Sequence, residues 1–137
     1  MKQKQMEKGF TLLKLIVVII IIGILATLGF AQYTKTLEKG RAAEAKLILG
    51  NLRSAEEAYY LENSAYATDV TLLAVNAPTA CTTTHYFSYT SSGTTIAAGI
   101  GTALRCTTGG KTPQAGTLYT INVTWASGGW GGTSGYY

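Results

Sequence analysis

An uncharged apolar run, Leu15–Ala31, constrains this chain more than any other feature of its sequence. It is 17 residues long and almost wholly aliphatic, close to the shortest helix that can cross a bilayer. Residues 10–13 extend it toward the N-terminus, and only Lys14 interrupts the combined apolar segment, residues 10–31. The sequence therefore predicts a membrane-compatible helix near the N-terminus with one cation a short way inside it.

A short basic leader, MKQKQMEKG, precedes this segment. Positive charge beside a membrane helix keeps that end in the cytoplasm, so we expect the remainder of the chain to be exported. A secretory signal would be cut after small residues that follow the apolar run. Here the run continues into FAQYTKTLEKGRAAEAK, a helix-forming sequence. We therefore predict that the apolar helix is retained in the mature protein.

The stretch KGFTLLKLIVVIIIIGILATLGFAQY resembles the prepilin signature of type IV pilins and pseudopilins. Glycine, phenylalanine, threonine, two leucines and a long aliphatic run follow one another in the family's order. The resemblance implies that a prepilin peptidase cuts between Gly9 and Phe10, making residues 1–9 a leader, and that the new amine is methylated. An ordinary N-terminal membrane anchor is the alternative interpretation.

The resemblance also implies that the apolar helices leave membrane lipid and bundle into a filament, helped by an inner-membrane assembly platform. The expected assembly residues are Leu13, Lys14, Leu15, Ile16, Val17, Ile20, Ile24, Leu28 and Phe30. Most family members have glutamate at the position of Lys14, and most major pilins have proline at the position of Ala31. The glutamate is thought to neutralise the first amine of a neighbouring subunit, which a lysine does not do.

Three interpretations of Lys14 stay open. It meets a carboxylate of a different subunit in a mixed filament, it snorkels to the membrane interface, or it is not the native residue. We favour snorkelling in the membrane, with some compensating group in the filament. The sequence does not identify that group.

Residues 32–62 are rich in helix formers, and no proline occurs between Phe10 and Glu62. Apolar residues recur there at spacings of three and four, which places them on one helix face: Ala45, Ile48, Leu52, Ala55 and Tyr59. The charged residues, Glu38 and Glu56 among them, are assigned to the remaining, solvated face. One helix over residues 10–62 is predicted, apolar at first and then amphipathic.

After Asn63 the composition changes to Thr, Ser and Gly, and the helical spacing disappears. We expect a loop over 65–81 with a helical turn at 71–75, then strand segments at 84–90, 94–100, 102–106 and 117–125. The last segment alternates most clearly, with Tyr119, Ile121, Val123 and Trp125 on one side. The predicted class is α+β, an antiparallel sheet of three or four strands in a head of residues 63–137, packed on the long helix.

The glycine-rich tail, SGGWGGTSGYY, reads as too polar and flexible to build a core. Its aromatic residues, Trp130, Tyr136 and Tyr137, are expected to adhere to the head or to a neighbouring subunit. Cys81 and Cys106 both lie in the part expected to be exported, where a single disulfide is the natural interpretation and two buried free thiols the alternative. Two cysteines and one histidine fall short of the usual four zinc ligands.

The composition of residues 63–137 argues against catalysis, because Asp69 is the only acidic residue there. This excludes paired-carboxylate hydrolysis and a carboxylate calcium site in that region. The lone histidine, His85, is interpreted as a half-buried strand residue, and Arg105 and Lys111 as solvated cations rather than a nucleic-acid surface. We predict no enzyme activity, no metal, no cofactor and no nucleic-acid partner.

The prediction is a homo-oligomeric structural subunit of a type IV pilus-like filament. The precursor is expected in the inner membrane and the filament on the cell surface. The alternative is a minor pilin, or a pseudopilin of type II secretion or DNA uptake, whose head binds a ligand. An enzyme anchored by an uncleaved helix is a more remote possibility.

Overall fold

The computed structural model describes residues 3–114, 116 and 118–137, with side chains from residue 11 onward. The chain divides into two compact units, Met1–Leu37 and Glu38–Tyr137, which we call the helical unit and the head unit. One helix, α1 (Gln3–Asn63), supplies the helical unit and the first part of the head unit. The long helix predicted over 10–62 is confirmed.

Within the head unit, α1 presents a buried stripe. Its members recur at alternating spacings of four and three residues, which keeps them on one helix face: Glu38, Ala42, Ala45, Leu49, Leu52 and Glu56. Ile48 is also buried beside the stripe, and Ala55 and Tyr59 are half-buried. The predicted apolar face is therefore confirmed. The assignment of Glu38 and Glu56 to a solvated face is wrong, because these two glutamates mark the ends of the buried stripe.

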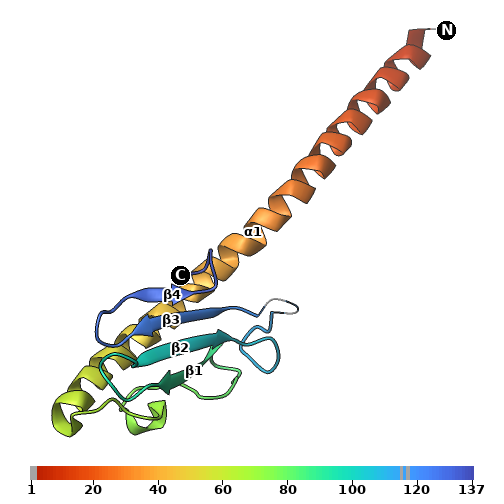
Figure 1. Ribbon diagram of the computed structural model, residues 1–137. Coiled ribbons are helices and arrows are strands. Elements are labelled where there is room, and N and C mark those ends of the chain that lie inside the picture. The colour runs from red at the N-terminus through yellow and green to blue at the C-terminus, as the bar shows by residue number, and fades with distance from the viewer. Residues whose placement is uncertain (1–2, 115, 117) are drawn as a thin grey trace. The chain divides into compact units, whose positions relative to one another are not determined.

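The sheet of the head unit is an antiparallel meander of four strands, β1 (Phe87–Ser92), β2 (Ile100–Arg105), β3 (Thr120–Thr124) and β4 (Trp130–Gly132). Figure 1 shows them side by side in chain order against the second half of α1. The register pairs Phe87 with Arg105 and Ala103 with Ile121. A short 3₁₀ helix, η1 (Val70–Leu72), lies near the predicted helical turn.

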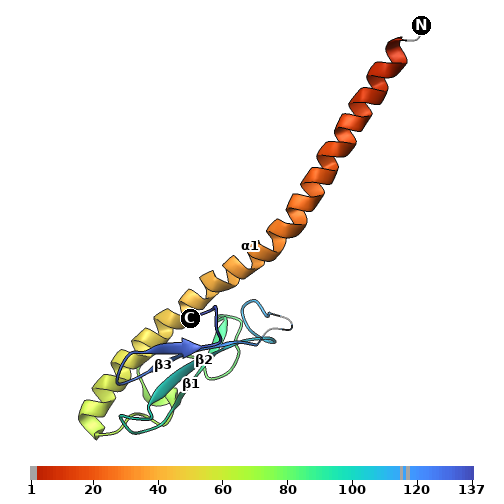
Figure 2. The same ribbon diagram turned by 45° about the horizontal axis from the view of Figure 1, so that its top comes forward.

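One face of the sheet is apolar and packs on α1. Figure 2 shows the sheet lying along this part of the helix. Side chains of alternating sequence positions reach this face and are all fully buried: Phe87, Tyr89, Ala103, Tyr119, Ile121, Val123 and Trp125. On the opposite face of β3 the residues are only partly buried. The alternation predicted for residues 117–125 is therefore confirmed, and the α+β class with it.

The strand predicted at 94–100 is wrong. Residues 93–99 form the connection between β1 and β2, with a turn closed by hydrogen bonds from the Ala98 and Gly99 N–H groups to Thr95 O. Gly93 enters this loop with φ of 77°, a conformation that favours glycine. Ile96, which lies within the predicted strand, is 59% exposed. Alternation over a few residues does not distinguish a strand from a loop that contains small residues.

The other strand bounds shift, and the tail gains structure. The strand predicted at 84–90 begins only at Phe87, and the segment predicted at 102–106 is β2. The tail forms β4, whose backbone pairs with β3. Tyr136 stacks on Tyr119 with ring centroids 3.9 Å apart, whereas Trp130 and Tyr137 stay partly exposed. The tail therefore extends both the sheet and the aromatic core, against the expectation of a flexible segment.

Candidate functional site

The apolar segment exposes apolar side chains on every side of the helix. Every Leu, Ile, Val and Phe side chain between residues 11 and 31 is exposed, from 43% at Ile16 to 71% at Phe30. An 18-residue window of α1 has a mean hydropathy of 2.8, so this helix is long and apolar enough to cross a membrane. A helix that is apolar all round needs lipid or other helices around it.

The structure places the predicted assembly residues on this surface. Leu13, Leu15, Ile16, Val17, Ile20, Ile24, Leu28 and Phe30 are all exposed. Lys14 is exposed as well and makes no ion pair with any residue whose side chain the structure describes. No side chain before residue 11 is described, so the cleavage site between Gly9 and Phe10 stays a prediction.

Thr27, a polar residue inside the apolar run, hydrogen-bonds within its own helix. Thr27 Oγ1 donates to Ile24 O, three residues earlier, at 2.8 Å. A hydroxyl bonded in this way costs little in lipid, because its proton does not need a partner outside the helix. Lys14 differs, because a hydrogen bond to a neutral backbone carbonyl would leave its positive charge uncompensated.

In the head unit, Arg105 joins β2 to α1 from a fully buried position. Its Nε and Nη2 donate to Glu38 Oε2 and Oε1 at 2.9 and 3.1 Å, a two-pronged ion pair. Nη1 donates to Tyr86 O and Cys106 O, and Nη2 also donates to Thr112 O at 2.7 Å. All five guanidinium N–H donors are therefore used, as burial of this group requires.

The Glu38 carboxylate accepts hydrogen bonds from both α1 and the sheet side of the head unit. Besides Arg105, the Tyr119 hydroxyl donates to Oε2 at 2.9 Å, and Arg41, one turn along α1, donates to Oε1. The carboxylate thus joins the helix, the end of β2 and the residue before β3. We call these four side chains, Glu38, Arg41, Arg105 and Tyr119, the buried joint.

The protonation states of the buried joint follow from these contacts. Burial alone would raise the pKa of Glu38, but hydrogen bonds from Arg105, Tyr119 and Arg41 outweigh it and hold that pKa below its usual value. Burial would lower the pKa of Arg105, and Glu38 reverses this. Burial and the bond to Glu38 both raise the pKa of Tyr119. At neutral pH Glu38 and Arg105 therefore form an ion pair, and Tyr119 is a neutral phenol.

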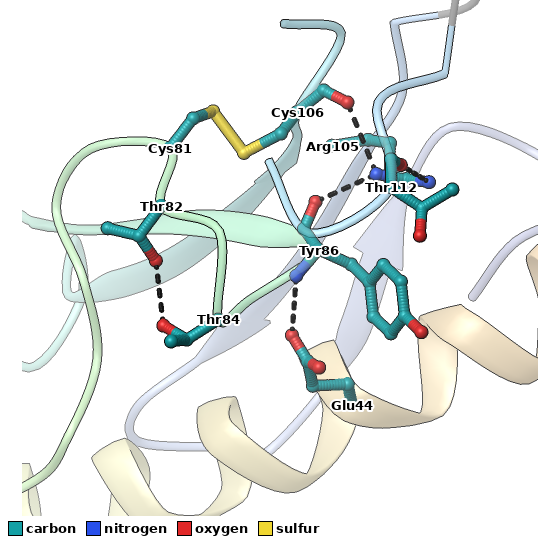
Figure 3. Close-up of a disulfide and its surroundings, with 8 residues drawn as sticks. All are labelled: Glu44, Cys81, Thr82, Thr84, Tyr86, Arg105, Cys106 and Thr112. Atoms are coloured by element: carbon teal, nitrogen blue, oxygen red, sulfur yellow. Dashed lines mark hydrogen bonds between the residues drawn. A yellow bond between two sulfur atoms is a disulfide. The ribbon is translucent and has the colours of Figure 1, made fainter. Parts of the chain in front are cut away.

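The disulfide lies close to Arg105 of the buried joint, as Figure 3 shows. Cys81 and Cys106 are bonded, with Cα atoms 5.7 Å apart, which confirms the predicted disulfide. Cys106 follows Arg105 in sequence, and its carbonyl accepts from that guanidinium. Glu44, on α1, accepts the Tyr86 N–H at 2.9 Å. The start of β1, the end of β2 and α1 are thus connected within one small region.

Cations also gather around one ring. Arg41, Arg105 and Lys111 place their charged groups 5.3, 5.4 and 5.0 Å from the centroid of the Tyr86 ring. The face of an aromatic ring attracts a cation, and this attraction is strongest where water is excluded. The interpretation of Arg105 as solvated is therefore wrong, whereas Lys111 is exposed as predicted.

The second buried glutamate connects the other end of the stripe. Glu56 Oε2 accepts the Ala67 N–H at 2.8 Å, and Oε1 accepts the Ser91 hydroxyl at 2.8 Å. Ala67 belongs to the loop after α1, and Ser91 to the end of β1. The two carboxylates, 18 residues apart on α1, lie about 27 Å from each other along the helix axis. They hold both ends of the sheet to the helix.

The described residues do not form a catalytic arrangement. His85 pairs through Nδ1 with Thr84 Oγ1 at 2.8 Å, and it precedes β1 rather than lying in it. Asp69 caps η1 by accepting the Thr71 N–H at 2.8 Å. No group of three His, Cys, Asp or Glu residues suited to a metal ion occurs in the part of the chain that the structure describes.

Comparison with known proteins finds a fimbrial protein, a type IV pilin and a type II secretion protein among the relatives. The chain is 36% identical over 66 residues to the fimbrial protein EcpC of Eikenella corrodens, covering 48% of this chain and 43% of the relative. It is 34% identical over 73 residues to the type IV major pilin PilE1 of Neisseria gonorrhoeae, covering 53% and 44%. It is 40% identical over 80 residues to the type II secretion system core protein G of Aeromonas hydrophila, covering 57% and 56%.

The chain is thus similar to type IV pilins and to a type II secretion core protein. It spans about half the length of the curated relatives it matches. No family model and no solved structure matches it. The resemblance read from the N-terminal signature is thus confirmed, and the pilin-type helix and four-stranded head unit agree with it.

The buried joint was missed at the sequence level, although a signal was present. Glu38 and Glu56 continue the four-three spacing of Ala42, Ala45, Leu49 and Leu52. A charged residue in register with an apolar stripe indicates a buried carboxylate with partners. Arg105 carries a weaker signal, because it falls on the same side of β2 as Ala103 and its partner is 67 residues away in sequence.

Proposed function

We propose that this chain is a structural subunit of a type IV pilus-like filament, without enzymatic activity. The observation that carries the proposal is the apolar segment, exposed on all sides of α1 with one charge in it. The relatives named as pilins and fimbrial proteins support it. In the proposed life cycle the precursor lies in the inner membrane, with residues 10–31 in lipid.

Maturation removes the leader in this proposal. A prepilin peptidase cuts between Gly9 and Phe10 on the cytoplasmic side, where the basic leader is retained. An inner-membrane platform then extracts the subunits, and their apolar helices bundle into the filament core. Residues 63–137, with the second half of α1, form the outer surface of an extracellular filament.

The apolar helix is covered by lipid before assembly and by other helices afterwards, which explains why such a filament persists. If roughly 1,500 Å² of apolar surface per subunit is covered by lipid before assembly and by other helices afterwards, the hydrophobic term hardly changes. Exposure of the same area to water costs on the order of tens of kcal/mol. The subunit therefore moves between membrane and filament at low cost and does not dissolve.

Filament purification with a processing variant tests the proposal. Filaments are sheared from cells that express the native chain, Gly9→Val or Gly40→Ala. We expect the native chain and Gly40→Ala in the sheared fraction, because Gly40 lies on α1 beyond the apolar segment and an added methyl group there meets nothing within 4 Å. We expect Gly9→Val to stay in the membrane at precursor length. Loss of both variants from the filaments, or of neither, contradicts the proposal.

A second candidate is a minor pilin or a pseudopilin whose head binds a ligand. Similarity to a type II secretion core protein and the lysine in the apolar segment favour it. Abundance separates the two candidates. A major subunit dominates the protein of sheared filaments, whereas a minor one is present in traces.

A further inference from the structure

Lys14 has no other charged residue near it in the apolar segment. It is the only charged residue between Phe10 and Thr34, and the first carboxylate after it is that of Glu38. It makes no ion pair with the described side chains. The segment around it is apolar on every side. In the mature filament proposed above, on which this inference rests, that segment is enclosed by other helices.

An enclosed ammonium group needs an anion. Its transfer to a bilayer centre or helix bundle costs several kcal/mol unless it pairs or reaches water. Cleavage before Phe10 would aggravate the problem, because the new α-amine lies four residues from Lys14, one helical turn away. Two like charges at this spacing repel each other. Both cations therefore favour a neighbour that brings negative charge to this depth.

An identical copy does not supply that charge. Every copy lacks Asp and Glu between residues 10 and 37. Glu38 comes 24 residues after Lys14, and in the head unit it already accepts bonds from Arg105, Arg41 and Tyr119. Recruiting it for Lys14 in a neighbour would leave Arg105 buried and unpaired. A filament of this chain alone thus stacks unneutralised cations.

We propose that this chain co-assembles with a second pilin-type subunit whose apolar helix carries an aspartate or glutamate at the depth of Lys14. The partner is specified by charge complementarity: an apolar helix that fits the exposed segment, with one carboxylate to pair with the ammonium group. The pairing gives selectivity as well as attraction, because a lysine opposite a lysine is disfavoured. Lys14 thereby directs the subunit to unlike neighbours.

A charge-swapped copy of the same chain is the probe. Full-length native chain and a Lys14→Glu variant, each labelled at an introduced Gln32→Cys, are reconstituted in phosphatidylcholine vesicles, and energy transfer reports association. Gln32 is exposed, and the two native cysteines are bonded to each other. We expect the mixed pair to associate about tenfold more tightly than either like pair. Lys14→Met mixed with native chain is the matched control and should show no such gain.

Two results in vesicles would overturn the inference. One is equal association of the mixed and like pairs. The other is native chain that pairs with itself as tightly as the mixed pair once anionic phosphatidylglycerol is added. In that case lipid phosphate, not a partner helix, neutralises Lys14.

Filaments from the source cells provide the second arm. We expect an antibody against the head unit to recover a second pilin-type subunit with an acidic residue in its apolar segment. Filaments composed of this chain alone would overturn the inference and leave the proposed function intact. Absence of the chain from all filaments would instead overturn the proposed function, whatever the vesicles show.

Discussion

Arg105 Nε lies 2.9 Å from Glu38 Oε2, and through this contact the end of β2 is tied to the first buried turn of α1 in the head unit. Removing one partner of such a pair leaves the other charge buried without compensation. We expect Arg105→Met to lower the free energy of unfolding of the head by about 3 to 5 kcal/mol. Guanidinium titration of the full chain in detergent, followed by near-UV circular dichroism, measures it.

The control for Arg105→Met is Lys46→Met, which removes an exposed cation from the same helix and should change stability by less than about 0.5 kcal/mol. Glu38→Gln combined with Arg105→Met should cost less than the sum of the single changes, because neither charge is then left alone. Strict additivity of the two would show that the contact is not energetically coupled.

Acid should weaken the head through Glu38. Its pKa in the folded chain lies below the ordinary value of 4.5, so the unfolded state binds its proton first as pH falls. The stabilisation is complete above about pH 4.5 and is lost as pH falls through the folded-state pKa. Denaturant titrations between pH 7 and 2 should show this decline, and Glu38→Gln should reduce it.

The pH series needs two reference variants. Glu62→Gln alters an exposed carboxyl and should follow the native chain. Asp69, whose pKa is lowered by its bonds to Thr71, contributes a residual slope that should persist in Glu38→Gln. An acid decline unchanged by Glu38→Gln would rule out the buried joint as its main source.

The disulfide should contribute through the loop that it closes. Cys81 and Cys106 are 25 residues apart, and a closed loop of that size stabilises by about 3 to 4 kcal/mol in the chain-entropy model. We expect the double variant Cys81→Ser/Cys106→Ser to lose about this much. Adding reductant to the native chain should reproduce the loss, and reductant should leave the double variant unchanged. A reductant effect on that variant would point to another cause.

Gly101 should be intolerant of any side chain. A methyl group there would enter the ring of Trp125, which lies fully buried over β2. Such overpacking costs about 1 to 3 kcal/mol, so the melting temperature of Gly101→Ala should fall by several degrees. Gly40→Ala, on α1 with nothing within 4 Å of the added carbon, should be neutral or stabilising. Equal melting temperatures for the two variants would contradict the packing described.

Local pattern predicted the elements whose signal is repeated over many residues. The spacing of Ala45, Ile48 and Leu52 located the helix face, and the alternation around Ile121 located β3. The run before Ala31 and the glycine–phenylalanine pair indicated the family. These features depend on the spacing of residues that are close in sequence, so they could be predicted without knowing any distant contact.

Features that depend on distant contacts were missed. The burial of Glu38 depends on Arg105, 67 residues later, and composition alone makes both look solvated. β4 forms because the backbone of β3 leaves an edge to pair with, not because Gly131 or Gly132 favours a strand. Tyr136 gains its place from Tyr119. These contacts join residues that are distant in sequence. A pattern among neighbouring residues therefore does not predict them.

Intact-mass spectrometry of this chain in sheared filaments tests the central claim most directly. The account predicts a single species of residues 10–137 with one added methyl group and with Cys81 and Cys106 oxidised, so the apolar segment travels into the filament. A chain that begins at Met1, or a soluble fragment that begins after Ala31, would contradict it.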